Sequence, residues 1–167
     1  LEVGDKDVAL LTDLLADLGA HALLTALSQL EAGCIRWTRQ DAEHVTYAEK
    51  IGKDELSLSP ADTVEQACRK VRASSAAHPA HAIVAGKDIT VLAAQPAPAE
   101  QADAACAGME PGSVRFVAKR LYLGAADSAI ELMEVKPAGK AAMAAKAFAA
   151  GIQGIKEDTK TWEGPRG

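Results

Sequence analysis

The sequence has 167 residues, of which 49% are hydrophobic and 25% are charged, with a formal net charge of −5. These proportions are typical of a globular protein and exclude a chain that is disordered throughout. No apolar run approaches the roughly 18 residues of a membrane span, and no segment resembles a signal peptide, so neither a membrane protein nor a secreted one is expected. The cysteines Cys34, Cys68 and Cys106 are isolated and odd in number, which indicates reduced thiols and a cytoplasmic location.

Charge is distributed unevenly along the chain. Residues 1–60 hold 11 acidic and 5 basic side chains, whereas residues 61–167 hold 12 acidic and 13 basic ones. The second part is therefore nearly neutral. Net charge alone does not predict a nucleic-acid-binding protein.

The first predicted element is a helix over residues 7–31, because leucines recur at helical spacing on one side of it. Asp5 is expected to cap its start, and Gly33 follows its end. A lone amphipathic helix cannot bury its own apolar stripe, so we expect a partner, for which chain preceding Leu1 is the natural candidate. In this chain alone, the exposed stripe predicts self-association.

Residues 34–54 are polar, mixed in charge and without periodicity, which predicts a linker. A short strand is expected at 56–58. A helix from about residue 62 to 74 follows, with Asp62 as its cap and Glu65 completing a capping box.

From about residue 75 the apolar period changes from 3.6 to 2. Segments 82–84 and 89–92 predict a hairpin, and further short strands are expected at 114–117, 121–123 and 130–135. Residues 95–108 are predicted to be a loop or marginal helix, residues 141–150 a terminal helix, and residues 151–167 a poorly ordered tail. The predicted fold class is therefore α+β: a long helix and a linker, then a small, mostly antiparallel, OB-like β-barrel with a packed helix.

No catalytic or metal site is predicted from the residues. His78 and His81 have a spacing that metal ligands can adopt, but no cysteine or carboxylate clusters with them and Pro79 lies between them. The sequence contains no Ser-His-Asp arrangement and no glycine loop of the kind that binds phosphate.

Two segments are more specific. Residues 40–51 read QDAEHVTYAEKI, and residues 136–143 read KPAGKAAM directly after a predicted strand. Taken alone, they are a polar linker and a strand-to-helix turn with two lysines. In this order they resemble the methionyl-tRNA formyltransferase family, over about residues 7–150. The turn at 76–80 lacks the aromatic residue usual in that family, Lys146 stands near a position where the family tends to have an acid, and the loop at 95–108 is unusually long.

The resemblance implies the domain boundaries that we expect. Residues 1–33 would be the last helix of a catalytic domain, 34–54 an interdomain linker, 55–150 an OB-like tRNA-binding domain, and 151–167 a tail. The family transfers a formyl group from 10-formyltetrahydrofolate to the amino group of initiator methionyl-tRNA in translation initiation. Its catalytic Asn, His and Asp would lie before Leu1, in an N-terminal catalytic domain that would be a partner of this chain. The chain itself is therefore expected to be inactive and to bind no cofactor.

An OB-like barrel binds nucleic acid largely through phosphates, with lysines and arginines on one face. Arg115 and Lys119 are predicted to lie on one sheet face because they alternate with Val117. Two alternatives remain open: the C-terminal domain of a related formyltransferase acting on a nucleotide-linked amino sugar, and a protein-interaction module. On the tRNA interpretation the candidate contacts are Lys50, Lys53, Lys87, Arg115, Lys119, Arg120, Lys136 and Lys140.

Overall fold

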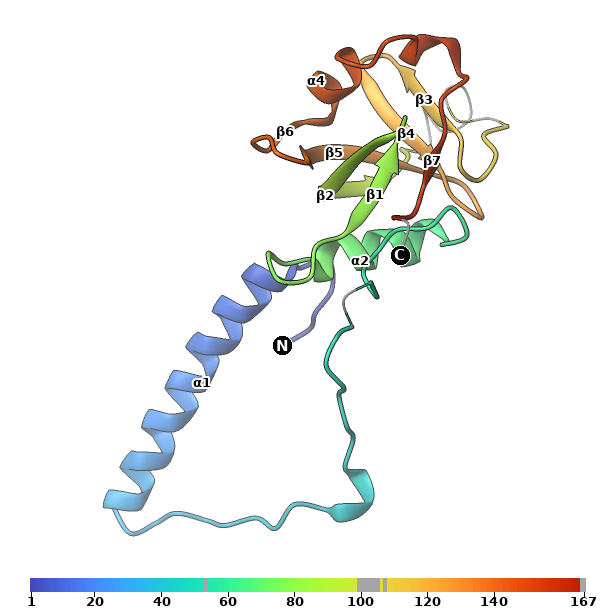
Figure 1. Cartoon of the computed structure of the whole chain (residues 1–167). Helices are drawn as coiled ribbons and strands as arrows, with labels where there is room; N and C mark the ends of the chain where they lie inside the picture. Colours follow the sequence, from blue (N-terminus) through green and yellow to red (C-terminus); the bar gives the residue numbers. More distant parts are fainter. Residues whose placement is uncertain (53, 99–105, 107, 166–167) are drawn as a thin grey trace. The chain divides into compact units, whose positions relative to one another are not determined.

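The structure is a computed structural model that describes residues 1–52, 54–98, 106 and 108–165 (Figure 1). It divides into two compact units, Leu1–Ile51 and Gly52–Gly167. Each unit is described by itself.

The first unit consists of one long helix and an extended segment. Helix α1 (Val8–Glu31) begins at Asp7, whose side chain accepts a hydrogen bond from the Leu10 backbone nitrogen, so Asp7 and not Asp5 is the cap. The short 3-10 helix η1 (Ala42–His44) interrupts the segment that follows. No residue of α1 is buried: Leu11 and Leu14 are half-buried, and its other leucines are exposed.

Helix α1 also corrects the prediction that no segment has the length and composition of a membrane span. Its most apolar 18-residue window has a mean hydropathy of 1.4. The core helix of a soluble protein or a signal sequence meets the same criterion, so this observation assigns no membrane.

The second unit is a small barrel of short strands (Figure 1). Helix α2 (Val64–Ala73) precedes the strands, and the short helix α4 (Ala145–Ala150) and the 3-10 helix η2 (Ile155–Glu157) follow most of them. The strands are β1 (His81–Val84), β2 (Lys87–Pro96), β3 (Val114–Val117), β4 (Arg120–Gly124), β5 (Ala129–Pro137), β6 (Met143–Ala144) and β7 (Trp162–Glu163).

The strands form one antiparallel sheet in the order β3-β4-β5-β2-β1-β7, with β6 paired to β5. The backbone just before and within β7 also bonds to the start of β3: Val114 N donates to Lys160 O at 3.0 Å, and Trp162 N donates to Gly112 O at 2.8 Å. These bonds bring the two ends of the sheet together. The mostly antiparallel, barrel-like α+β fold expected from the sequence is confirmed.

Two tight turns set the register of the hairpins. Ala85 and Gly86 join β1 to β2, and Ala118 and Lys119 join β3 to β4, and all four have positive φ. This is the backbone of the two-residue turns that match the twist of antiparallel strands. The hairpin predicted at 82–92 is present, with its turn at Ala85 and Gly86.

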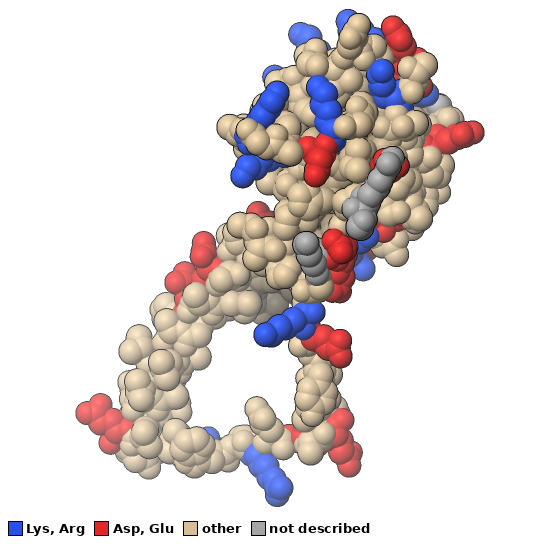
Figure 2. Space-filling model, viewed as in Figure 1, with Lys and Arg blue, Asp and Glu red and all other residues tan. Residues whose placement is uncertain are grey.

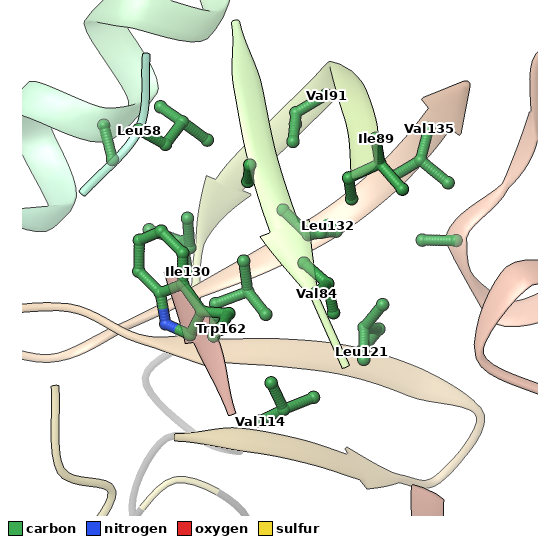
Figure 3. Packing of buried hydrophobic residues seen from close by; sticks show 14 of the residues in the cluster. Leu58, Val84, Ile89, Val91, Val114, Leu121, Ile130, Leu132, Val135 and Trp162 are labelled. Carbon is green, nitrogen blue, oxygen red and sulfur yellow. The ribbon is translucent and has the colours of Figure 1, made fainter. Parts of the chain in front are cut away.

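The core is aliphatic except for a few aromatic residues. Figure 3 shows Trp162 lying among valines, leucines and isoleucines that come from most of the strands. Helix α2 contributes four residues from one face: Val64, Ala67, Cys68 and Val71. The apolar stripe that the sequence predicts for this helix is thus the face that packs on the barrel.

Several local expectations differ from the structure. Residues 56–58 form no strand, although Leu56 and Leu58 are buried. Thr63, not Asp62, caps α2, in a capping box with Gln66. Asp62 accepts hydrogen bonds from Lys70 and from the Ser59 backbone nitrogen instead.

The segment after Gly151 differs most from its prediction as a poorly ordered tail. It contains η2 and β7, and Ile152, Ile155 and Trp162 are buried in the core. Its sequence is polar overall, and only contact with distant strands gives it a fixed structure.

Candidate nucleic-acid interface

Among the described residues, two hollows of the barrel surface lie beside α4. The larger has a volume of about 710 Å³ and is lined by β3, α4 and the segment around η2. The smaller, of about 380 Å³, is lined by the start of β2, the end of β5 and α4. Ala147 contributes to both. Helix α4 therefore forms a ridge between two concave surfaces.

Five lysines surround this ridge. Lys87 and Lys140 border the smaller hollow, and Lys119, Lys146 and Lys156 border the larger one. We call these five the α4 lysines. Figure 2 shows lysine and arginine side chains gathered over the barrel, with acidic side chains among them.

Sequence reasoning found three of the α4 lysines and missed Lys146 and Lys156. Neither lies in a strand or in the KPAGKAAM segment, so no periodicity connects them with Lys87 or Lys119. The fold brings them together because α4 and η2 both follow the barrel strands and cover its surface near the β3–β4 turn. Their positive charge in a terminal region was the only available signal.

Within the described residues, no carboxylate lies within ion-pair distance of Lys119, Lys140, Lys146 or Lys156. Lys87 donates a 3.4 Å hydrogen bond to Gly151 O, and its Nζ lies 6.0 Å from the centre of the Phe148 ring. These ammonium groups are thus available to an external anion, which is the arrangement that phosphate binding requires.

The two arginines among the predicted contacts have partners inside the chain. Arg115 Nε lies 3.4 Å from Asp158 Oδ2, and Arg120 Nη1 lies 3.0 Å from Glu131 Oε2. Glu131 is only 3% exposed and also accepts a hydrogen bond from Gln95. Both arginines therefore help to hold the fold together.

The position of Lys119 corrects one argument from the sequence. Lys119 lies in the β3–β4 turn with a φ of 62°, so strand alternation does not place it on one face with Arg115. It belongs to the larger hollow because the turn, rather than the strand, presents it there.

The remaining predicted contacts lie elsewhere. Lys136 is exposed on β5 opposite Thr90, on the same side of the strand as Glu134, and it borders neither hollow. Lys50 is exposed in the first unit. Lys53 lies outside the described residues.

Some titratable side chains are buried in the apolar core. Besides the main core there is a smaller apolar cluster, which contains Cys106, Tyr122 and Ala129. Burial raises the pKa of Tyr122, and the Glu131 carboxylate raises it further. Burial also raises the pKa of the Cys106 and Cys68 thiols. These shifts favour the neutral side chains, so neither thiol is activated as a nucleophile.

Among the described residues there is no group of three histidine, cysteine or carboxylate side chains that could hold a metal ion.

Comparison with known proteins identifies the family. Residues 50–153 match the formyl transferase C-terminal domain. The chain therefore belongs to the formyl transferase family through this domain.

Curated relatives in this family extend the comparison. A methionyl-tRNA formyltransferase of Methylococcus capsulatus is 37% identical over 150 residues, which are 87% of this chain and 46% of that protein. A methionyl-tRNA formyltransferase of Bifidobacterium longum is 33% identical over 158 residues, 86% of this chain and 48% of that protein. The chain thus spans about half the length of the curated relatives that it matches.

Solved structures show the same fold at lower identity. HypX from Aquifex aeolicus superposes with a TM-score of 0.70 over 95% of this chain and 28% of HypX, at 19% identity. A second HypX structure, in complex with tetrahydrofolic acid, superposes with a TM-score of 0.60 over 83% of this chain and 24% of HypX, at 21% identity.

Proposed function

We propose that this chain is the tRNA-binding C-terminal part of a methionyl-tRNA formyltransferase. In the intact protein, the catalytic half would formylate the amino group of initiator methionyl-tRNA during translation initiation in the cytoplasm. The barrel would bind the tRNA through its phosphates. This proposal rests on the family membership, on the names of the curated relatives and on the surface of the barrel.

The observation that carries the proposal is the α4 lysines. Arg115 and Arg120 form ion pairs with Asp158 and Glu131, whereas the five α4 lysines have no carboxylate partner among the described residues. They surround a convex ridge between two hollows. A nearly neutral domain thereby presents a locally positive surface, which suits a phosphate backbone.

Lys50, Lys53 and Lys136 stay in the proposal as secondary contacts. Lys50 and Lys53 would touch a tRNA that runs along both the barrel and a catalytic half, and Lys136 would extend the basic surface along β5. The paired Arg115 and Arg120 would act mainly by holding β3 and β4 in place.

The proposal assigns the chemistry to the half of the relatives that this chain does not match. We place the folate formyl donor, 10-formyltetrahydrofolate, and the catalytic Asn, His and Asp in that half. Among the described residues that line the two hollows there is no serine, threonine, cysteine or histidine, and lysines dominate the polar lining. This chain alone would show no formyl transfer.

The second candidate function is a C-terminal domain of a formyltransferase that acts on a nucleotide-linked amino sugar. The family domain and the fold favour it as much as they favour the tRNA enzyme. It would need no surface for an RNA backbone. The α4 lysines would then serve solubility only.

A salt titration of affinity for initiator tRNA tests the proposal. Each phosphate contact contributes about 0.9 to the slope of log affinity against log salt, so Lys140→Ala and Lys146→Ala should each lower the slope by about that amount. Lys140→Arg should retain the slope. Lys6→Ala, which removes the same charge from the first unit, should leave it unchanged.

Two results would contradict the proposal. Absence of salt-dependent tRNA binding would remove it entirely. Equal slopes for Lys140→Ala, Lys146→Ala and Lys6→Ala would leave the α4 lysines as a solubilising surface.

A further inference from the structure

We propose that the larger hollow beside α4 binds one unpaired nucleotide of the RNA, with the base against Phe116 and the phosphate among Lys119, Lys146 and Lys156. The inference deepens the proposed function and rests on it. It names a specific subsite within a surface that otherwise binds phosphates without regard to the bases.

The floor of this hollow is apolar. Phe116 is half-buried and packs on the core, while Ala147, Ala150, Ile152 and Ile155 line the rest. A volume of about 710 Å³ falls in the range of about 300–1,000 Å³ that small-ligand sites occupy. The apolar part of the lining consists of alanines and isoleucines besides Phe116, which gives a planar ring an apolar surface.

The rim of the hollow is basic. Lys119 comes from the β3–β4 turn, Lys146 from α4 and Lys156 from η2, so three separate elements direct ammonium groups to one place. Glu157 is the acidic residue of the lining and offers an acceptor for an exocyclic amino group. An aromatic floor under a trio of lysines matches a ligand with a flat ring and an adjacent anion, which is the chemistry of a nucleotide.

The wall formed by η2 is fixed in advance. Asp158, which directly follows η2, pairs with Arg115 of β3, and Lys160 O accepts a hydrogen bond from Val114 N at 3.0 Å. Ile152 and Ile155 anchor the same segment in the core. A preformed site loses less entropy on binding, which favours affinity for a ligand as small as one nucleotide.

The shape favours an unpaired nucleotide over a base pair. Duplex RNA presents phosphates, hydroxyl groups and base edges, and keeps the faces of its bases stacked inside the helix. Only a nucleotide outside a helix can lay its ring on Phe116. Stacking of a base on an aromatic side chain changes affinity by about fivefold to a hundredfold when the aromatic residue is removed.

The experiment measures affinity of the full chain for three RNA probes by fluorescence anisotropy. They are a single-stranded ten-nucleotide RNA, a ten-nucleotide RNA in which every nucleotide is abasic, and the duplex of the first RNA. We expect the abasic probe to bind about tenfold more weakly than the intact single strand. Phe116→Leu should abolish this difference and leave duplex affinity unchanged.

A second variant keeps the test independent of folding. Ala150 is exposed and lines the hollow, so Ala150→Trp should fill the site without removing any buried group. It too should abolish the preference for the intact strand. Thermal unfolding of both variants checks that the barrel is retained.

The outcomes separate this inference from the proposed function. If tRNA binding depends on Lys140 but Phe116→Leu and Ala150→Trp change nothing, the nucleotide subsite is wrong and the proposed function stands. If no RNA binds, both fail. A separate measurement uses adenosine monophosphate as the probe. If it binds tightly while the chain shows no preference among the RNA probes, the hollow binds a free nucleotide and the RNA subsite is wrong.

Discussion

The indole nitrogen of Trp162 donates a hydrogen bond to the carbonyl oxygen of Gly124 at 2.9 Å, across 38 residues of chain. The same carbonyl accepts a hydrogen bond from Gly112 N at 3.0 Å. Trp162 is 2% exposed and belongs to the core shown in Figure 3. One side chain of the last strand thus fixes the end of β4 and the approach to β3.

The first prediction follows from this contact. Trp162→Phe removes the hydrogen bond and leaves the Gly124 carbonyl one partner, so it should lower the free energy of unfolding by about 1 kcal/mol. Trp162→Ala also removes a large buried ring and should cost about 3–5 kcal/mol. Urea denaturation followed by circular dichroism measures both. Trp37 is 84% exposed, so Trp37→Ala provides the matched control and should change the barrel's stability by less than about 0.5 kcal/mol.

The second prediction concerns Gly124 itself. A Cβ added there would overlap the backbone carbonyl of Glu110 and approach Ser113 Oγ to 2.7 Å. Because a carbonyl held in the backbone cannot move aside cheaply, Gly124→Ala should lower the free energy of unfolding by about 2–3 kcal/mol. Gly19→Ala, where nothing lies within 4 Å, serves as the control. If Gly124→Ala were as stable as the wild-type chain, the backbone at Gly124 would not lie so close to Glu110 and Ser113.

Local patterns were enough to predict most of the barrel. Period-2 alternation located the hairpin of β1 and β2 and the strands β3, β4 and β5, and helical spacing located α1 and α2. Each of these patterns belongs to a single segment of the sequence. They therefore do not predict which segments distant in the sequence pair with one another. Nothing in the polar residues around Trp162 indicates that they pair with β1 and bond to residues next to β3.

The candidate site shows the same limit. The KPAGKAAM segment pointed to Lys140, and the hairpin turn pointed to Lys87. Lys146 and Lys156 join them only because α4 and η2 fold back beside β3. Conversely, the sequence could not show that Asp158 and Glu131 pair with Arg115 and Arg120, because these pairs form between separate elements.

The third prediction sorts the three thiols by reactivity. Cys34 is exposed, whereas Cys68 and Cys106 are buried. Burial raises the pKa of both buried thiols, so a smaller fraction of each is the reactive thiolate at pH 8. Burial also limits the access of a reagent to the two sulfur atoms. Reaction with Ellman's reagent should show one fast thiol and two slow ones. Cys34→Ser should remove the fast phase, and a second fast phase in that variant would contradict the burial of Cys68 or Cys106.

The fourth prediction concerns α1. No residue of this helix is buried, and Leu15, Leu18 and Leu27 are each 52% exposed. Exposed apolar stripes of this kind drive association, so the chain should form dimers or larger species at rising concentration. Sedimentation velocity measures this directly. Leu15→Lys combined with Leu18→Lys should restore a monomer, whereas a monomeric wild-type chain at high concentration would count against the prediction.

The last prediction separates the basic residues that hold the fold from those proposed to bind RNA. Arg120→Met leaves Glu131 buried with Gln95 as its remaining partner, so it should lower the free energy of unfolding by about 2–3 kcal/mol. This loss is smaller than is usual when a fully buried ion pair is broken. The reason is that the Arg120 side chain is 36% exposed, so water screens the pair. Lys140→Ala removes the same charge from an exposed turn, so stability should change by less than about 0.5 kcal/mol while tRNA affinity falls. Arg120→Met with Glu131→Gln should recover part of the loss, because no buried charge then lacks its partner. Urea denaturation and tRNA affinity are measured on the same samples. If Lys140→Ala destabilised the barrel as much as Arg120→Met does, the division between fold-stabilising and RNA-binding basic residues would be wrong.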